Sequence, residues 1–441
     1  MLYFYTKVGM NNKGGRIWIE GETLNRAGFK PQKKFKVDYN PKGIEIKLSK
    51  EGERNVSKRT RSNMTYPIID LNNSKILEIF DEDTPLMCSV EKGIIKISTH
   101  KIKELQMERE ESLLSKIKKN KPLTESTLFC GGGISAHAIS QGLKDKGIKT
   151  ELEAIADESV SYLQVAERNL KPKKIYKGKV EDIHIEDITK SDILSFSMPC
   201  TGHSNQGKAK KGIKFAEEHD EASTAIFGVL NFVVNSNPSI LISENVTQAR
   251  NSATYILLRA ELKRLGYEVF EYTLDNKQAG SIEARVRYWF VAISKGLLKK
   301  NKLEETIPTF KRKYSSIKSI ITKRENEKWM PKTYFNARLE KNISNNRNFA
   351  PSFMENSDKS VRTIPRNYMK RQISNPHYYS KTEDKIRLFN PVEHAKLKGI
   401  PPKLIKDIAD TTAHEILGQS ILYNHARGIA NMIGDFLNQL K

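Results

Sequence analysis

The sequence contains little cysteine and no long hydrophobic run. Its three cysteines, Cys88, Cys130 and Cys200, stand far apart in 441 residues, a spacing that fits neither a disulfide framework nor a zinc site. No apolar stretch is long enough to span a bilayer, and the N-terminus lacks the pattern of a signal peptide. We therefore expect a cytoplasmic protein with reduced cysteines, no bound metal and no membrane partner.

Acidic residues are in the minority. There are 75 lysines and arginines against 52 aspartates and glutamates, which gives a formal net charge of +23. Such an excess suits a polyanionic partner such as nucleic acid, although lysine is abundant throughout the chain and general lysine richness would also produce it. The hydrophobic content of 38% is ordinary for a globular protein, and the length allows two or three domains.

Residues 1–104 contain a faint internal repeat. The stretches 16–50 and 67–101 both read as strand, short helix, strand, turn and strand, and each turn contains a glycine, Gly43 or Gly93. Both units resemble the AbrB-like swapped-hairpin fold, a small DNA-binding barrel built from two such units. The pattern therefore predicts a β-rich domain, which is either a tandem AbrB-like pair or an unrelated small β domain.

The pattern then changes from strands to a helix and to alternating elements. Residues 105–124 are predicted to form a helical linker whose charged residues make a solvated face. From residue 125 strands and helices alternate, which is typical of an α/β fold with a doubly wound, mostly parallel sheet. Ligands of such sheets bind beyond the carboxyl ends of the strands, so the residues at those ends are the candidates for chemistry.

The first two strand ends carry a glycine turn and an acid. Residues 128–135 (LFCGGGIS) place three glycines between a strand and a helix, where the backbone can turn tightly and a ligand can approach closely; a purely structural turn is equally compatible. Glu158 stands at the end of the next strand, where a carboxylate can accept hydrogen bonds from ribose hydroxyls. The simpler alternative for Glu158 is an ordinary acidic residue at a helix start.

The later strand ends carry a thiol, a carboxylate and two guanidinium groups. Cys200 follows a buried strand and Pro199 in a polar loop, where nearby positive charge would favour the nucleophilic thiolate. Glu244 ends an apolar strand, a costly position for a carboxylate unless it is used or hydrogen-bonded. Arg285 and Arg287 are two residues apart and so share one face at a strand start.

In this order the motifs resemble those of the DNA (cytosine-5)-methyltransferase family. The segments 387–402 and 415–436 are similar to the last two motifs of that family. The resemblance implies a Rossmann-like, S-adenosylmethionine-dependent catalytic domain at 125–296 that is completed by 386–441. It also implies a small inserted target recognition domain at 297–385, which is basic and contains scattered aromatic residues.

The resemblance implies a covalent mechanism. C5 of cytosine is not nucleophilic until a thiolate adds at C6, and in the family this thiolate would be that of Cys200. Glu244 would hold N3 and the exocyclic amine of the base, Arg285 would lie near O2, and Arg287 would support Glu244. Because these ring atoms lie inside the duplex stack, the base must be flipped out, at a cost of a few kcal/mol.

The resemblance also assigns binding residues. Those expected around S-adenosylmethionine are Phe129, Gly131, Gly133, Ile134, Glu158, Pro199, Gln419 and Ser420. Those expected to contact DNA are Ser204, Gln206 and Lys208, near phosphates, and Thr363, near the flipped base. In the recognition domain, lysine and arginine would contact phosphates, while arginine, asparagine and glutamine would read base edges.

Several positions depart from the family pattern. Thr127 stands where an aspartate is usual, Ile134 where a glycine is common, and Lys179 where an acid is expected near the adenine amine. Glu283 replaces a glutamine, and Gln419 replaces an asparagine. These departures concern cofactor affinity, and Glu283 also concerns the packing of the recognition region.

The implied protein is a DNA cytosine-5 methyltransferase that acts as a monomer on duplex DNA, either in a restriction-modification system with a cognate endonuclease or as an orphan or phage enzyme. Two alternatives remain: a tRNA cytosine-5 methyltransferase on the same scaffold, and a DNA-binding regulator that has lost cofactor affinity. The predicted recognition domain and N-terminal domain favour duplex DNA. The presence of Cys200 and Glu244 argues against the regulator.

Overall fold

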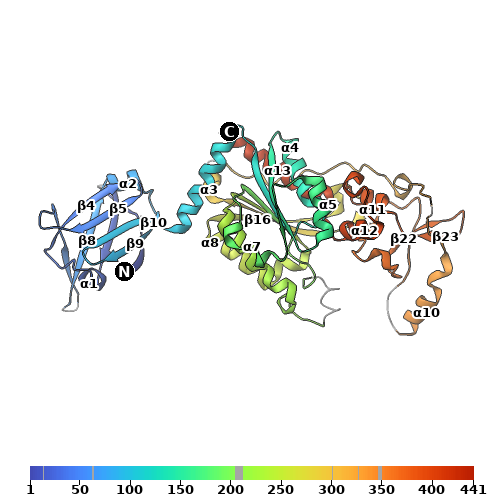
Figure 1. Ribbon diagram of the computed structural model, residues 1–441, viewed down its shortest axis with the longest axis horizontal. Coiled ribbons are helices and arrows are strands. Elements are labelled where there is room, and N and C mark those ends of the chain that lie inside the picture. The colour runs from blue at the N-terminus through green and yellow to red at the C-terminus, as the bar shows by residue number, and fades with distance from the viewer. Residues whose placement is uncertain (13, 62–63, 204–211, 300, 326, 346–349) are drawn as a thin grey trace. The chain divides into compact units, whose positions relative to one another are not determined.

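A computed structural model describes the chain from Met1 to Lys441 apart from residues 13, 62–63, 204–211, 300, 326 and 346–349. The chain forms two compact units, Met1–Glu108 and Arg109–Lys441, which are described separately (Figure 1). Among the residues described, no helix is both long and apolar enough to cross a membrane.

The N-terminal unit contains two antiparallel sheets. The six-stranded sheet has the order β1 (Leu2–Lys7), β9 (Pro85–Glu91), β10 (Ile94–Thr99), β5 (Gly43–Leu48), β4 (Lys34–Asn40) and β6 (Arg54–Asn55). The four-stranded sheet has the order β2 (Gly9–Asn11), β3 (Gly14–Glu20), β8 (Met64–Asn73) and β7 (Ser57–Arg61). Two short helices, α1 (Glu22–Arg26) and α2 (Lys75–Ile79), complete the unit.

The predicted repeat is visible in how these strands pair. Each repeat runs strand, short helix, hairpin: β3–α1–β4–β5 in the first and β8–α2–β9–β10 in the second. Corresponding strands of the two repeats pair with one another, because β3 lies antiparallel to β8 and β5 lies antiparallel to β10. The repeats therefore build one shared core, while their AbrB-like character remains a prediction.

The second unit is built on a seven-stranded sheet, which confirms the predicted α/β fold. Its order is β13 (Lys174–Lys177), β12 (Thr150–Asp157), β11 (Leu123–Leu128), β14 (Ile193–Phe196), β15 (Ile240–Asn245), β18 (Arg287–Ser294) and β16 (Tyr267–Leu274). The first five strands are parallel, and β18 is antiparallel to both of its neighbours. The strand order reverses between β11 and β14, which makes the carboxyl ends of these two strands the expected ligand site.

Helices from both ends of this unit cover the sheet. Helix α4 (Ile134–Asp145) packs against the C-terminal helix α13 (Tyr423–Gln439), and α5 (Val160–Leu170) contacts β12 and β13. Helices α7 (Asp220–Ser236) and α8 (Ala253–Arg264) contact each other, and α8 lies on β16. The return of α13 to α4 brings the last predicted motif beside the glycine turn.

Only part of the predicted linker connects the two units. Helix α3 (Lys101–Lys118) crosses the boundary between the units, and the first strand of the sheet begins at Leu123. The expectation of a solvated charged face is wrong at Arg109, which is buried and donates hydrogen bonds to Ser294 Oγ and the Leu265 carbonyl, both at 2.8 Å. These bonds tie the second half of α3 to the seven-stranded sheet and its neighbouring turn.

The region between β18 and the C-terminal helices forms small sheets of its own. One has the order β19 (Met330–Pro331), β23 (Lys385–Arg387), β22 (Pro376–Ser380) and β20 (Ser352–Met354), and the other pairs β17 (Glu283–Ala284) with β21 (Val361–Arg362). Helix α10 (Asn336–Ser344) lies in this region, and α11 (Pro391–Leu397) and α12 (Asp410–Gln419) follow it. One apolar cluster joins the region to α11 through Ile364, Phe389 and Leu397.

Candidate active site

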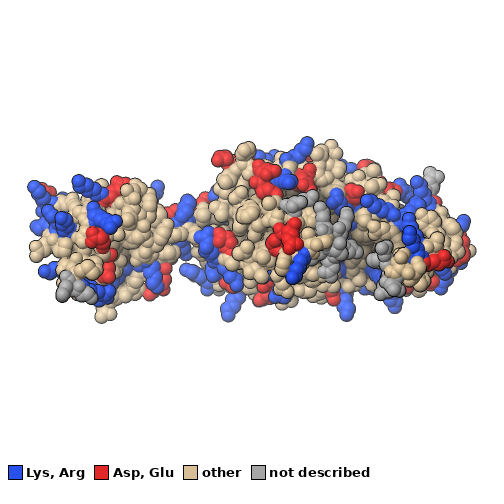
Figure 2. Space-filling view, turned by 90° about the horizontal axis from the view of Figure 1, so that it is seen from below, with Lys and Arg blue, Asp and Glu red and all other residues tan. Residues whose placement is uncertain are grey.

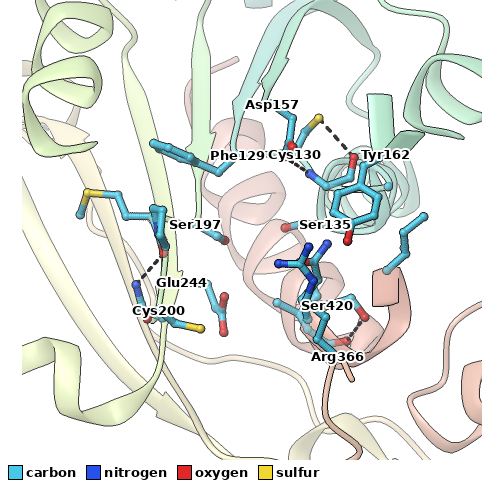
Figure 3. A pocket seen from close by; sticks show the side chains of 18 of the residues that line it. Phe129, Cys130, Ser135, Asp157, Tyr162, Ser197, Cys200, Glu244, Arg366 and Ser420 are labelled. Atoms are coloured by element: carbon cyan, nitrogen blue, oxygen red, sulfur yellow. Dashed lines mark hydrogen bonds between the residues drawn. The ribbon is translucent and has the colours of Figure 1, made fainter. Parts of the chain in front are cut away.

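A cavity of about 480 Å³ lies at the carboxyl ends of β11, β12, β14 and β15. Most of the residues proposed from the sequence line it: Phe129, Gly131, Ile134, Glu158, Pro199, Cys200, Glu244, Arg285, Arg287, Thr363, Gln419 and Ser420. Figure 3 shows Cys200 and Glu244 at one side of the cavity and Asp157 and Tyr162 at the other. The cavity therefore has two ends with different side chains.

The glycine turn shapes the second end. Gly131 and Gly133 have φ values of 51° and 79°, which favour glycine. A side chain at Gly133 would collide with Leu170, so this glycine allows α4 to pack on α5. Gly133 is the one proposed cofactor residue in the described part of the chain that does not line the cavity. In the structure Gly133 therefore serves helix packing, and its contact with the cofactor remains a prediction.

The acid that ends β12 is Asp157, not Glu158 as predicted. The Asp157 carboxylate accepts hydrogen bonds from the backbone N–H groups of Gly131, at 2.8 Å, and Ser159, at 2.9 Å. Burial raises the pKa of this carboxyl, while these backbone hydrogen bonds oppose the shift. Because Asp157 and Glu158 both line the cavity, the acidic function at this strand end can be shared between them.

The loop after β14 presents Cys200 to the first end of the cavity. The backbone of this loop is held from β15, because Asn245 Nδ2 donates to the Met198 carbonyl at 3.0 Å and to the Tyr255 hydroxyl at 2.9 Å. Asn245 was not singled out from the sequence, although it directly follows Glu244. Its burial shows why an amide suits this position: it satisfies two partners inside the sheet edge.

Glu244 is held in place by one of the two arginines. Its carboxylate Oε1 lies 2.9 Å from Arg287 Nε, and only 8% of Glu244 is exposed. Arg285 instead donates to the carbonyl oxygens of Gly418 and Gln419, at 3.4 Å each. The guanidinium of Arg287 thus contacts the Glu244 carboxylate, while that of Arg285 contacts the turn after α12.

The surroundings of Cys200 have opposing effects on the pKa of its thiol. Although the Cys200 residue is exposed at the surface, the protein atoms around its thiol desolvate it and raise its pKa above the ordinary value, and the negative charge of Glu244 adds to this effect. Arg287 and Arg285 lower the pKa but do not cancel the rise. The thiol is therefore largely protonated in the free protein at neutral pH, and any gain of positive charge or loss of negative charge nearby would favour the thiolate.

This balance predicts opposite effects of two neighbouring substitutions on the alkylation of Cys200 by iodoacetamide. Because only the thiolate reacts, the rate should rise with pH in the unmodified protein. Glu244→Gln removes a negative charge and should shift that rise to lower pH, whereas Arg287→Gln should shift it to higher pH. Mass spectrometry of the labelled protein measures the rate.

The other two cysteines provide an internal reference for this labelling. Cys88 and Cys130 are buried, and burial raises the pKa of both thiols, that of Cys88 to about 12. They should therefore stay unlabelled while the protein is folded. Shifts in the same direction for Glu244→Gln and Arg287→Gln would contradict the electrostatic description of the site.

The cavity region contains two residues that were not predicted, and it shows how some of the departures from the family pattern are accommodated. Tyr162 and Arg366 line the cavity, with the Arg366 guanidinium 5.6 Å from the Tyr162 ring centre. At the first departure, the buried hydroxyls of Thr127 and Ser195 are 2.8 Å apart and join β11 to β14. The buried Thr127 hydroxyl thus has its hydrogen-bond partner in Ser195, with no aspartate at this position. Two further departures, Ile134 and Lys179, line the cavity.

The DNA-contact predictions fall on two different parts of the chain. Ser204, Gln206 and Lys208 lie outside the described residues. Thr363 lines the cavity, and its hydroxyl donates to the Ala284 carbonyl at 2.7 Å. Within the described ranges, no group of three or more histidine, cysteine, aspartate or glutamate side chains could hold a metal ion.

Comparisons with known proteins agree with this geometry. Residues 124–435 match the family model of C-5 cytosine-specific DNA methylases. The type II methyltransferase M.HaeII of Haemophilus aegyptius is 26% identical over 270 residues, which cover 59% of this chain and 79% of that protein. M.BsuFI of Bacillus subtilis is 25% identical over 333 residues, covering 71% of this chain and 73% of that protein.

Solved structures show the same fold at lower identity. A DNMT2 mutant of Spodoptera frugiperda superposes with a TM-score of 0.56 and 16% identity, covering 70% of this chain and 99% of that one. The methyltransferase EhMeth of Entamoeba histolytica gives a TM-score of 0.54 at 17% identity, covering 73% of this chain and 99% of that one. The family match begins at residue 124, so it leaves the N-terminal unit outside.

Proposed function

Because the chain belongs to the C-5 cytosine-specific DNA methylase family, and is therefore a cytosine-5 methyltransferase, we propose that it transfers a methyl group from S-adenosylmethionine to a flipped-out cytosine in duplex DNA. One observation carries the proposal: Cys200, Glu244, Arg285 and the glycine turn line a single cavity at the switch point of the sheet. A nucleophile and a base-holding carboxylate thus lie within reach of one bound cofactor.

The chemistry assigned to the chain begins at the thiolate. Cys200 Sγ adds to C6 of the cytosine, and the electron pair of the C5–C6 double bond becomes available at C5. Glu244, held by Arg287, keeps N3 and the exocyclic amine in place as charge builds on the ring. C5 gains the methyl group as the S–CH3 bond of the donor breaks, with S-adenosylhomocysteine as the leaving group. C5 then loses its proton to a base, the C5–C6 double bond re-forms, and the thiolate leaves.

The residues at the second end suit S-adenosylmethionine, which supplies an electrophilic methyl group when bound. The glycine turn leaves room for close approach, and the N-terminus of the twelve-residue helix α4 faces the same space. Asp157 and Glu158 offer carboxylates for the ribose hydroxyls. Phe129, Ile134 and Pro199 offer apolar surface, and Gln419 and Ser420 contribute from the turn after α12.

Duplex DNA is the proposed substrate because of charge and of the inserted region. Figure 2 shows lysine and arginine side chains spread over the visible face of both units, with fewer acidic ones. Residues 297–385 are proposed as the recognition domain, and Thr363 reaches the cavity from this region. The type II methyltransferases among the relatives support a place in a restriction-modification system. The proposal adds a cognate endonuclease as partner and action as a monomer on DNA.

Labelled methyl transfer to duplex DNA and to tRNA, measured side by side, tests the substrate. We expect label in DNA, and bisulfite sequencing of DNA from expressing cells should then reveal one short methylated sequence. Label in tRNA alone would replace the proposal by a tRNA methyltransferase. Calorimetry that detects no S-adenosylmethionine binding at millimolar concentration would favour a DNA-binding regulator.

We propose that the N-terminal unit makes an auxiliary contact with DNA phosphates through strand β7. All five residues of this edge strand (SKRTR, 57–61) are exposed. Arg59 lies 3.7 Å from Glu20 and is partly neutralised, whereas no charged partner of Lys58 or Arg61 lies within ion-pair distance among the described residues. A basic edge strand of this kind suits the phosphate backbone.

Replacing Lys58 and Arg61 together with glutamine should weaken DNA binding and reduce its salt dependence. The slope of log affinity against log salt should fall by up to about 2, one for each lost phosphate contact. Fluorescence anisotropy over a salt series measures it. The matched control is Lys92→Gln with Lys96→Gln, which removes equal charge at the β9–β10 hairpin. Equal slopes for the two double variants would refute a specific role of β7.

A further inference from the structure

A buried ion pair lies directly behind the arginines of the cavity. Lys398 Nζ is 3.0 Å from Glu283 Oε1, and neither side chain is exposed to solvent. Lys398 follows helix α11, whereas Glu283 lies in strand β17, 115 residues earlier in the chain. Glu283 is one of the positions at which the sequence departs from the family pattern. The departure introduces the carboxylate with which Lys398 pairs.

The two cations around Glu283 also hold the turn after α12. Lys398 Nζ donates to the Ser420 carbonyl at 3.2 Å, and Arg285 donates to the carbonyls of Gly418 and Gln419. Arg285 lies 3.6 Å from the same carboxylate oxygen that receives Lys398. One carboxylate therefore organises two cations, and these cations grip three successive carbonyls of a turn that lines the cavity.

Charge balance explains why both partners are needed. Burial lowers the pKa of Lys398 to about 7 and that of Arg285 to about 10, and in both cases Glu283 opposes the shift. His394 lies 3.9 Å from Glu283, but burial lowers its pKa well below the usual value, so it is neutral and supplies no counter-charge. Removing Glu283 would leave two buried cations side by side without their carboxylate, whereas removing Lys398 would leave Glu283 with Arg285 as its remaining cation, at 3.6 Å.

We propose that Glu283 and Lys398 act as a pair of positioning residues that hold Arg285 against the 418–420 turn. In this way they fix the position of the cofactor end of the cavity relative to the cytosine end. The inference rests on the proposed function, since it assigns the turn to the cofactor end. It also gives the departure at Glu283 a physical reason: the carboxylate is matched by a lysine from a distant segment.

A charge-removal cycle tests the pair. Glu283→Gln and Lys398→Gln should each weaken the binding of S-adenosylhomocysteine by about tenfold. The first leaves two buried cations without their carboxylate, and the second removes the cation that holds the Ser420 carbonyl and draws Glu283 onto Arg285 alone. The double variant, with two amides facing each other, should recover to within about threefold of the unmodified protein. Calorimetry measures the affinity, and thermal unfolding establishes that each variant is folded at the temperature used.

Lys396→Gln is the matched control. Lys396 lies in α11, two residues before Lys398, and donates to the Ile320 carbonyl at 3.3 Å and not to the 418–420 turn, so its loss should leave the affinity unchanged. A double variant no better than the weaker single one would overturn the proposal. So would single variants that lose thermal stability but keep full affinity when folded. Absence of binding by the unmodified protein would instead refute the proposed function.

Discussion

Replacing Cys200 with serine should abolish methyl transfer, with a loss on the order of 10⁴-fold or more, as is typical when a catalytic nucleophile is removed. A serine hydroxyl keeps the shape of the side chain but is not ionised near neutral pH, so it cannot add to C6. Single-turnover transfer from labelled S-adenosylmethionine to duplex DNA measures the loss. Affinity for S-adenosylhomocysteine should stay close to that of the unmodified protein.

The control for this variant is Cys88→Ala, because Cys88 lies in the N-terminal unit. It removes a buried cysteine without touching the cavity and should retain transfer. If Cys200→Ser transferred methyl groups at a rate comparable to that of the control, the nucleophile would have to be sought elsewhere in the cavity.

Replacing Glu244 with glutamine should lower the single-turnover rate by about 10²–10³-fold, the range seen when one preorganised polar contact to a charged transition state is removed. Glutamine keeps the shape of the side chain but loses the charge paired with Arg287. The same variant should react faster with iodoacetamide near neutral pH, since the pKa of Cys200 falls. Faster alkylation together with slower methyl transfer would show that Glu244 acts by holding the cytosine base and not by activating the Cys200 thiol.

Glu271→Gln is a suitable control for that variant. Like Glu244, Glu271 forms an ion pair with arginine: it lies 3.3 Å from Arg250 and 3.7 Å from Arg259, but it belongs to β16 and does not line the cavity. Its replacement removes an equivalent charge pair and should leave the transfer rate within about twofold. A loss as large as that of Glu244→Gln would indicate a general effect on the sheet.

The sheet and most of the cavity were predictable because they follow from local pattern. Alternating strands and helices require a mostly parallel sheet, and parallel strands bring their carboxyl ends to one edge. The glycine turn, the loop of Cys200 and the strand of Glu244 therefore converge without any knowledge of side-chain contacts. The repeat of the N-terminal unit was visible for the same reason, since each half has its own strand, helix and hairpin signals.

What the sequence did not reveal depends on contacts between distant residues. The Asp157 carboxylate at the end of β12 is held by the backbone N–H of Gly131, 26 residues earlier. Gly133 is required by Leu170 on a neighbouring helix, and Arg109 is buried by Ser294 and Leu265. The pairing of Glu283 with Lys398 likewise appears only when β17 and α11 meet. Local spacing carries no signal of such pairs.

The covalent bond between Cys200 and the cytosine ring can be trapped with a duplex that contains 5-fluorocytosine at the methylated position. Fluorine at C5 cannot leave as the proton does, so the thiolate stays attached after methyl transfer. We predict a protein–DNA adduct that survives denaturing electrophoresis, maps to Cys200 by mass spectrometry and is absent in Cys200→Ser. Folded protein that binds both cofactor and this duplex yet forms no adduct would contradict the proposed mechanism.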